Sequence, residues 1–211
     1  MGCPNIGGQL IHLPRSVRTV ELMNCPKVEG NISFFTGMDL TTLNLRWCTK
    51  ITGHISCMEN MASLTDVNLG NIGPLIVGNL CMLPPTVTNL NMAYCPSIQG
   101  DLETFAAKCT RVESLNLEGC HLVAGGITPH LVDWLSAMKE KNLNSCGRFY
   151  LTGDMSEVTT PTVDLSNMGT LEGKLGAIPT SVMVLRLAGC WKVSGSKADL
   201  QSMLPHCKIF M

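Results

Sequence analysis

Cysteine and histidine are the residues of this sequence best suited to chemistry, because both bind metals and a thiolate is a nucleophile. The 211 residues contain eleven cysteines and five histidines. No two cysteines have the spacing Cys-x-x-Cys, and no histidine lies at a zinc-ligand spacing from a cysteine pair. Metal or redox chemistry at the cysteines is therefore a minor alternative, which requires accessible, reactive thiols.

Enzymatic catalysis requires an acid, a base or a nucleophile to be gathered in one place. The five histidines are scattered rather than repeated at one position, and neither a glycine-rich phosphate loop nor a Gly-x-Ser-x-Gly motif occurs. They are His12, His54, His121, His130 and His206. We predict that the protein is not an enzyme and that it uses no cofactor and no metal.

Seven of the cysteines recur at a regular interval instead. They are Cys3, Cys25, Cys48, Cys95, Cys120, Cys146 and Cys190. A small and weakly polar thiol packs like an apolar side chain, so these residues are predicted to be reduced members of a core. The odd number of cysteines and the expected free thiols favour an intracellular, reducing compartment, either the cytoplasm or the interior of an organelle.

The cysteines belong to a longer pattern, apolar-x-x-apolar-x-apolar-x-x-Cys-x-x-apolar-x-Gly. Full copies start near residues 17, 40, 64, 87, 112, 138, 160 and 182. A partial copy occupies residues 1–16, and residues 204–211 are predicted to form a closing strand. Some copies are degenerate, since Ile72 and Met168 replace the cysteine and Lys141 occupies an apolar position. We interpret residues 1–211 as a single domain built from repeats.

This pattern resembles the leucine-rich-repeat family, whose unit L-x-x-L-x-L-x-x-N/C-x-L has a period of about 20 to 29 residues. The cysteine position is similar to that of the cysteine-containing subclass, and residues 28–32, 51–55 and 151–155 resemble the plant-type I-x-G-x-I segment. The resemblance implies an α/β fold: a right-handed solenoid with a concave parallel β-sheet and a convex side of loops and a few short helices. Three segments are expected to be helical: residues 101–109, where Leu102, Phe105 and Ala106 share one face, the segment after Thr128-Pro129, which supplies an N-cap and a first-turn proline, and residues 196–204.

In such a solenoid the residue between the two strand leucines faces the concave surface. This predicted row consists of Glu21, Asn44, Asn68, Asn91, Asn116, Asn142, Asp164 and Arg186. Two interpretations stay open at this point. The amides form a ladder in which each bonds the next and stiffens the sheet, or the row is a polar floor that binds a protein or peptide.

Three residues beside this row are candidate interface anchors, because arginine and aromatic residues are enriched at interfaces. They are Arg46, Trp47 and Tyr94. Trp47 is the preferred contact residue, and its alternative role is to pack against Gly70 and Asn71 of the next repeat.

Charge and hydropathy limit the classes of partner. Fifteen basic and sixteen acidic residues give a net charge of −1 without a basic stripe, so direct nucleic-acid binding is not expected. No apolar run has the length of a membrane span, and residues 1–10 lack the features of a signal peptide. We therefore expect a non-catalytic protein–protein interaction scaffold or an accessory subunit of a larger assembly. The alternative is a ligand-sensing receptor ectodomain of the leucine-rich-repeat type.

The first residues begin partway through a repeat, since Cys3, Ile6 and Gly8 match its later positions. The first complete strand, over residues 17–22, is then expected at the edge of a sheet. An open edge strand readily pairs with another strand. We expect this edge to be covered, either by further repeats or by a partner that associates with it.

Overall fold

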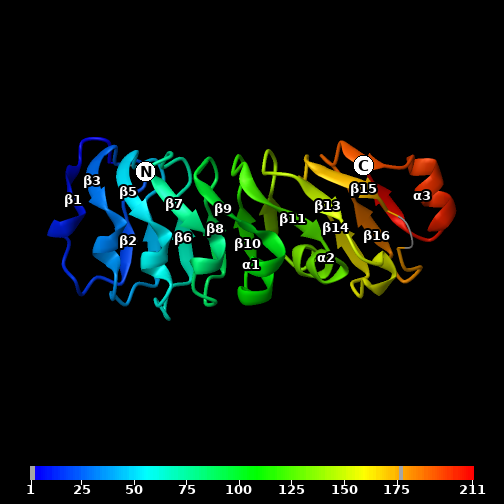
Figure 1. The fold of residues 1–211 in the computed structure, drawn as a ribbon, viewed down its shortest axis with the longest axis horizontal. Helices are drawn as coiled ribbons and strands as arrows, with labels where there is room; N and C mark the ends of the chain where they lie inside the picture. The colour runs from blue at the N-terminus through cyan, green and yellow to red at the C-terminus, as the bar shows by residue number, and fades with distance from the viewer. Residues whose placement is uncertain (1–2, 176–177) are drawn as a thin grey trace.

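The computed structural model describes residues 3–175 and 178–211, which form a solenoid of short parallel strands. Figure 1 shows its coils stacked along the long axis, from the blue N-terminal end to the red C-terminal end. The short strands fall into parallel sheets because each strand pairs with the equivalent strand of the neighbouring coils.

One side of the solenoid is built from the strands that the leucine spacing predicts. Over the described residues it is a six-stranded parallel sheet in the order β12-β10-β8-β6-β4-β2. These strands are β2 (Thr19–Glu21), β4 (Thr42–Asn44), β6 (Asp66–Asn68), β8 (Asn89–Asn91), β10 (Ser114–Asn116) and β12 (Glu140–Asn142). The middle residue of each strand is apolar and buried except Lys141 of β12, whereas its two neighbours reach solvent. This alternation follows from the two-residue period of a strand.

The opposite side holds a second parallel sheet, where the sequence analysis expects loops. In the part of the chain that the structure describes it has nine strands, in the order β1-β3-β5-β7-β9-β11-β13-β15-β17. These are β1 (Gly7–Gln9), β3 (Lys27–Asn31), β5 (Lys50–His54), β7 (Ile76–Asn79), β9 (Ile98–Asp101), β11 (Leu122–Ile127), β13 (Phe149–Leu151), β15 (Leu171–Lys174) and β17 (Lys192–Ser194). The expectation of a looped convex side is wrong in this respect, because the apolar-x-Gly segments are extended and pair with one another.

The glycine of the repeat lies inside these outer strands. Gly53 of β5 has a φ of 127°, and a Cβ placed on it would lie 2.5 Å from Oδ1 of Asn31 in the preceding coil. Gly78 of β7 has a φ of 139°, and its Cβ would lie 2.6 Å from a side-chain carbon of Ile55. The glycine is thus needed for a left-handed backbone and for close stacking of successive outer strands.

Short helical segments connect the outer strands back to the first side. Most are single 3-10 turns: η1 (Leu10–His12), η2 (Ile32–Phe35), η3 (Ile55–Met58), η4 (Leu80–Met82) and η5 (Met155–Glu157). The α-helices among the described residues are α1 (Leu102–Lys108), α2 (Pro129–Ser136) and α3 (Lys197–Met203), in the three segments that the sequence predicts. Their N-caps Asp101, Thr128 and Ser196 each accept a backbone N–H bond from the first turn.

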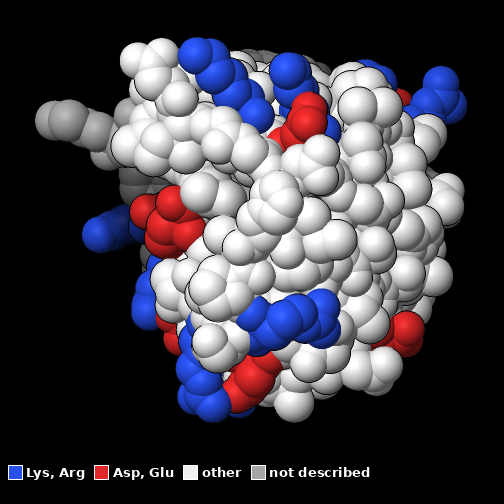
Figure 2. Space-filling view, turned by 90° about the vertical axis from the view of Figure 1, so that its left-hand side faces the viewer, with Lys and Arg blue, Asp and Glu red and all other residues white. Residues whose placement is uncertain are grey.

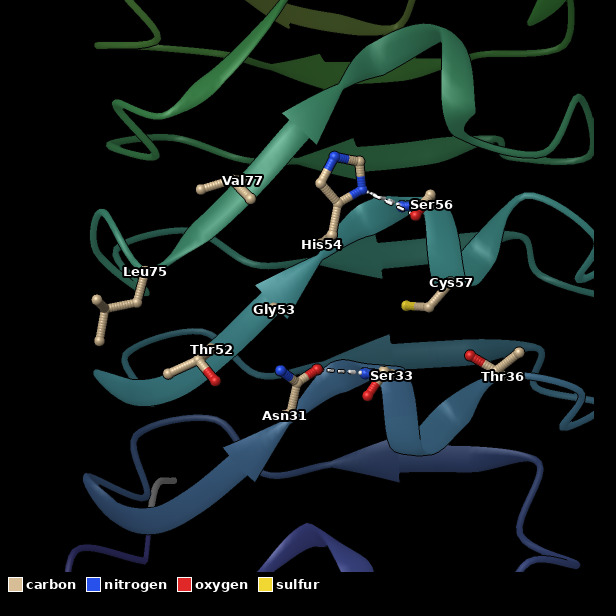
Figure 3. A pocket seen from close by; sticks show the side chains of 10 residues that line it. All are labelled: Asn31, Ser33, Thr36, Thr52, Gly53, His54, Ser56, Cys57, Leu75 and Val77. Carbon is tan, nitrogen blue, oxygen red and sulfur yellow. Dashed lines mark hydrogen bonds between the residues drawn. The ribbon is translucent and has the colours of Figure 1, made fainter.

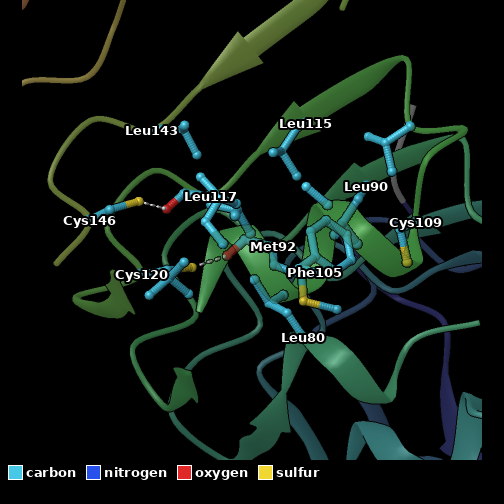
Figure 4. Packing of buried hydrophobic residues seen from close by; sticks show 14 of the residues in the cluster. Leu80, Leu90, Met92, Phe105, Cys109, Leu115, Leu117, Cys120, Leu143 and Cys146 are labelled. Atoms are coloured by element: carbon cyan, nitrogen blue, oxygen red, sulfur yellow. Dashed lines mark hydrogen bonds between the residues drawn. The ribbon is translucent and has the colours of Figure 1, made fainter. Parts of the chain in front are cut away.

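The space between the two sides is a continuous hydrophobic core (Figure 4). Five of the repeated cysteines are buried in it as predicted and Cys190 is half-buried against it, whereas the prediction is wrong for Cys3, which is exposed. All eleven cysteines are free thiols. The thiols also connect coils: Cys120 donates to the carbonyl oxygen of Met92 at 3.1 Å, and Cys146 to that of Leu117 at 3.1 Å. The cysteine position therefore combines apolar packing with a bond to the preceding repeat.

The first side is interrupted after β12. The described strands β14 (Thr162–Asp164), β16 (Val184–Arg186) and β18 (Lys208–Phe210) form a separate three-stranded parallel sheet. At the break the Leu143 N–H donates to the backbone oxygen of Asn167, and the Asp164 N–H donates to the hydroxyl oxygen of Ser136. The ladder is therefore lost where the apolar position of the repeat carries a lysine.

That lysine forms a buried ion pair across the break. The Lys141 side chain is only 6% exposed, and its Nζ lies 2.9 Å from Oδ1 of Asp164. Burial lowers the pKa of Lys141, opposed by its bond to Asp164. Burial alone raises the pKa of Asp164, but bonds from Lys141 and Ser166 hold it below its ordinary value. The ion pair offsets the cost of placing a charged group at an apolar position of the repeat.

Candidate binding face

The solvent-facing side chains of β2, β4, β6, β8, β10 and β12 form a surface that we call the polar face. They are Thr19, Glu21, Thr42, Asn44, Asp66, Asn68, Asn89, Asn91, Ser114, Asn116, Glu140 and Asn142. The strands are in register, so equivalent residues form straight rows across the sheet. The face is hollowed by a cavity of about 310 Å³ that these strands line.

Five asparagines form one of these rows, the asparagine row: Asn44, Asn68, Asn91, Asn116 and Asn142. Each Oδ1 accepts the backbone N–H of the residue two positions later, at distances of 3.0 to 3.3 Å. The interpretation as a ladder in which each amide bonds the next is therefore wrong. The strand ends directly after each asparagine, and the side chain satisfies an N–H of the following turn that no neighbouring strand reaches.

The orientation of the amide groups decides what the asparagine row offers to solvent. Because every Oδ1 is held by the chain itself, the Nδ2 groups remain as donors. Asn44 donates to Glu21 at 2.7 Å and Asn142 donates to Glu118 at 3.0 Å. Within the described residues, the Nδ2 atoms of the three central asparagines, Asn68, Asn91 and Asn116, have no protein acceptor. The centre of the polar face thus presents a line of amide donors.

The last two residues of the predicted row do not belong to the polar face. Asp164 and Arg186 lie in the three-stranded sheet beyond the break, where Asp164 binds Lys141. Arg186 lies over the Phe210 ring at 5.8 Å, with Nη1 3.9 Å from Asp164 Oδ2. The regular spacing places these residues in one line, but the buried lysine separates them from the asparagine row.

A row of residues with left-handed backbone borders the polar face. It occupies the position directly before the repeated cysteine, and each member has a φ between 56° and 81°. Its members are Asn24, Trp47, Asn71, Tyr94, Gly119, Ser145, Asn167 and Gly189. Asparagine and glycine tolerate this conformation, whereas it strains a bulky residue. Trp47 and Tyr94 nevertheless occupy it, with 46% and 50% of their surface exposed.

The surroundings of the two aromatic residues differ. The Tyr94 hydroxyl donates to Oε1 of Glu118 at 2.6 Å, and this bond raises the pKa of Tyr94. A Cβ on Gly119 would lie 3.0 Å from the Tyr94 ring, so glycine makes room for the ring. Trp47 instead lines a hollow of about 320 Å³ together with Met23, Asn24 and Arg46. Tyr94 is tied to the next coil, whereas Trp47 borders an open hollow.

Arg46 is the positive charge nearest to this hollow. Its Nε is buried and has no hydrogen-bond partner, and it forms no ion pair within residues 3–175 and 178–211. The backbone N–H of Arg46 is bound by Asn44, which fixes the start of its side chain next to Trp47. The sequence places both residues beside the asparagine row, but the strained backbone of Trp47 and the unsatisfied Nε of Arg46 emerge only in the structure.

A second hollow, of about 640 Å³, lies on the other side between η2 and η3 (Figure 3). His54, Ser56 and Cys57 line it. Nδ1 of His54 accepts the Ser56 N–H at 3.1 Å as the cap of η3 and lies 2.8 Å from the Ser56 hydroxyl oxygen. Burial raises the pKa of Cys57 to about 11. Among the described residues, no group of three or more histidine, cysteine or acidic side chains could hold a metal ion. This hollow therefore offers polar hydrogen-bonding groups.

The N-terminal end exposes two strand edges. In the described sheets, β1 pairs with β3 and β2 pairs with β4, and the other edge of each is open. Figure 2 shows this end with a mostly uncharged centre and charged residues towards its margins. Association through this end, as the partial repeat suggests, stays a prediction. No helix in the described ranges is both long and apolar enough to cross a membrane.

Comparison of the sequence with protein-family models and with curated proteins gives no match.

Proposed function

We propose that the protein is a non-catalytic protein–protein interaction scaffold, or an accessory subunit of a larger assembly, of the leucine-rich-repeat type. The cysteine-containing repeat, with its short strand and extended I-x-G-x-I segment, supports a right-handed solenoid of this family. The polar face is its concave binding surface. The eleven free thiols favour a reducing intracellular compartment over the alternative of a receptor ectodomain.

The line of free amide donors is the observation that carries this proposal. The Nδ2 groups of Asn68, Asn91 and Asn116 lie side by side without protein acceptors, on the floor of a hollow. Peptide carbonyl oxygens are the acceptors that a protein partner supplies in greatest number. Trp47 and Arg46 at the border add the residue types that most often anchor interfaces. The face therefore combines a polar floor with an exposed aromatic edge.

A tryptophan at Ser114 tests where the partner binds. Ser114 of β10 lines the hollow, and its side chain takes part in no hydrogen bond with the described residues. Ser114→Trp therefore fills the hollow and leaves the bonds of the asparagine row intact. We expect a partner identified by affinity purification and mass spectrometry to bind this variant at least tenfold more weakly in calorimetry.

Ser33→Trp is the matched control, because Ser33 lines the hollow on the other side and also exposes its hydroxyl. This variant should bind the partner like the unmodified protein, and both variants should keep its melting temperature. Full binding by Ser114→Trp would show that the partner does not use the polar face.

A further inference from the structure

The charged side chains that the polar face itself exposes are all negative. Glu21, Asp66 and Glu140 face solvent on β2, β6 and β12. The basic side chain on these six described strands is Lys141, which points into the molecule and binds Asp164. At the margin, Arg18 pairs with Asp39 and Lys139 pairs with Glu113, while Arg46 next to Trp47 forms no ion pair among the described residues. The six strands therefore expose three carboxylates and no basic side chain.

Two of these carboxylates are held in place by neutral neighbours. Asp66 accepts bonds from Asn89 Nδ2 at 2.7 Å and from the Thr65 hydroxyl at 2.6 Å. Glu21 accepts a bond from Asn44 at 2.7 Å. Amides and hydroxyls orient a carboxylate without neutralising it, so its charge remains available to a ligand. The face thus presents oriented carboxylates beside the amide donors of the asparagine row.

The dimensions of the face set the length of an occupant. Neighbouring strands are about 4.8 Å apart, so the five steps from β2 to β12 span about 24 Å. An extended peptide rises about 3.4 Å per residue and would cross this distance with about seven residues. Its carbonyl oxygens can accept from the amide donors while alternate side chains reach the carboxylates. Phosphates of a nucleic acid would meet the same carboxylates with repulsion.

We infer that the occupant of the polar face is an extended peptide segment of about seven residues that carries lysine or arginine. This inference rests on the proposed function, because it names the chemistry of a partner on the same face. Asn68, Asn91 and Asn116 bind its backbone, and Glu21, Asp66 and Glu140 bind its cationic side chains. The pairing of unlike charges sets which peptide binds and speeds its association.

Two fluorescein-labelled peptides of opposite charge test this inference. One has five Lys-Thr units and the other has five Glu-Thr units, so length and strand propensity are matched. Fluorescence anisotropy should show binding of the Lys-Thr peptide at low salt and at least a tenfold loss near 0.5 M salt, because exposed charges are then screened. The Glu-Thr peptide should not bind. Equal binding of the two peptides, or no binding of the Lys-Thr peptide, would overturn the inference.

Charge variants locate the contact. Asp66→Asn with Glu140→Gln removes two carboxylates of the polar face and keeps their shapes, so affinity for the Lys-Thr peptide should fall at least tenfold. Glu59→Gln with Glu157→Gln makes the same change in net charge at exposed positions of the 3-10 segments, away from the face, and should bind as before. Unchanged binding by the first variant overturns the inference, as does preferred binding of a labelled single-stranded oligonucleotide.

The two proposals fail in different ways. If Ser114→Trp abolishes binding of the native partner but the Asp66 and Glu140 variant retains it, the polar face binds a partner and the basic peptide is wrong. If Ser114→Trp leaves both the native partner and the Lys-Thr peptide bound, the face itself is not the site.

Discussion

Trp47 and Tyr94 occupy a backbone conformation that their neighbours fill with asparagine, glycine or serine. Left-handed backbone costs a bulky residue about 1 to 3 kcal/mol, so the surrounding coil must hold it there. The two rings gain little burial in return, since about half of each remains exposed. Residues that are strained and exposed together are more readily explained by a contact outside the chain than by packing within it.

Replacing Trp47 with asparagine should separate strain from function. We expect Trp47→Asn to raise the free energy of unfolding by about 1 kcal/mol, because asparagine accepts a φ of 65° more easily. Urea unfolding measures this change, and partner binding should weaken at the same time. Trp191→Asn is the control, because Trp191 is also exposed but lacks the positive φ. A less stable Trp47→Asn would mean that packing of the indole outweighs the strain.

At the scale of the element, the outer strands depend on contacts between coils. Asn31 caps η2, and its Oδ1 would lie 2.5 Å from a Cβ on Gly53. The capping asparagine of one coil therefore contacts the glycine of the next, and Asn79 of β7 and Gly100 of β9 repeat this contact. Each such contact, which we call the cap–glycine contact, packs the end of one outer strand against the middle of the next.

Gly53→Ala and Gly195→Ala should separate the cost of backbone strain from the cost of the clash at the cap–glycine contact. Both glycines have a φ near 130°, but the space around a Gly195 Cβ is open. Gly195→Ala should therefore destabilise the protein by about 1 kcal/mol, from the backbone alone. Gly53→Ala adds a clash with Asn31 and Ile32, and should cost at least about 2 kcal/mol more by chemical denaturation. Equal losses in the free energy of unfolding would indicate that the coils move apart at this contact without cost.

The break after β12 shows how one residue divides an element. The position of Lys141 is apolar in the other strands of this side, and its charge requires the carboxylate of Asp164. Asp164 binds the lysine across the break, and β14 does not pair with β12 as the preceding strands pair with each other. The polar face therefore ends at β12, which limits the binding surface to the first six strands.

At the scale of the whole molecule, buried thiols connect the coils along the solenoid. Burial raises the pKa of Cys95 to about 12 and that of Cys120 to about 11, from an ordinary value of 9.0. The same cause raises the pKa of Cys190 to about 11 near the other end. The unfolded chain therefore ionises these thiols at a lower pH than the folded one.

The solenoid should lose stability as pH rises above 9. Below pH 9 the thiols are protonated in both states, and their full contribution is present. Between pH 9 and about 11 the unfolded state releases protons that the folded state keeps, which lowers the free energy of unfolding by up to about 1.4 kcal/mol per pH unit for each thiol. Urea unfolding at pH 8 and pH 9.5 measures the slope. It should be shallower in a Cys95→Val, Cys120→Val variant, and an identical slope would contradict this account.

The sequence alone determined the features that depend on local spacing. Alternating leucines placed the strands of the polar face, because side chains of a strand alternate between core and solvent. Thr128-Pro129 located one helix, since a cap acts within the first turn, and the apolar face of Leu102, Phe105 and Ala106 located another. The rows of asparagines and cysteines followed from the same period.

The tertiary structure decided everything that depends on contacts between coils. The second sheet forms because extended segments about one repeat apart pair with each other, which no single repeat can show. The asparagine row turned its oxygens to the chain and its amides to solvent only when the strand ends were in place. The sheet ends where the buried Lys141 pairs with Asp164 of a later repeat, and Trp47 takes its strained backbone in the turn directly after a strand. Local spacing therefore predicts the repeat, while the packing of one repeat on the next shapes the surface that it presents.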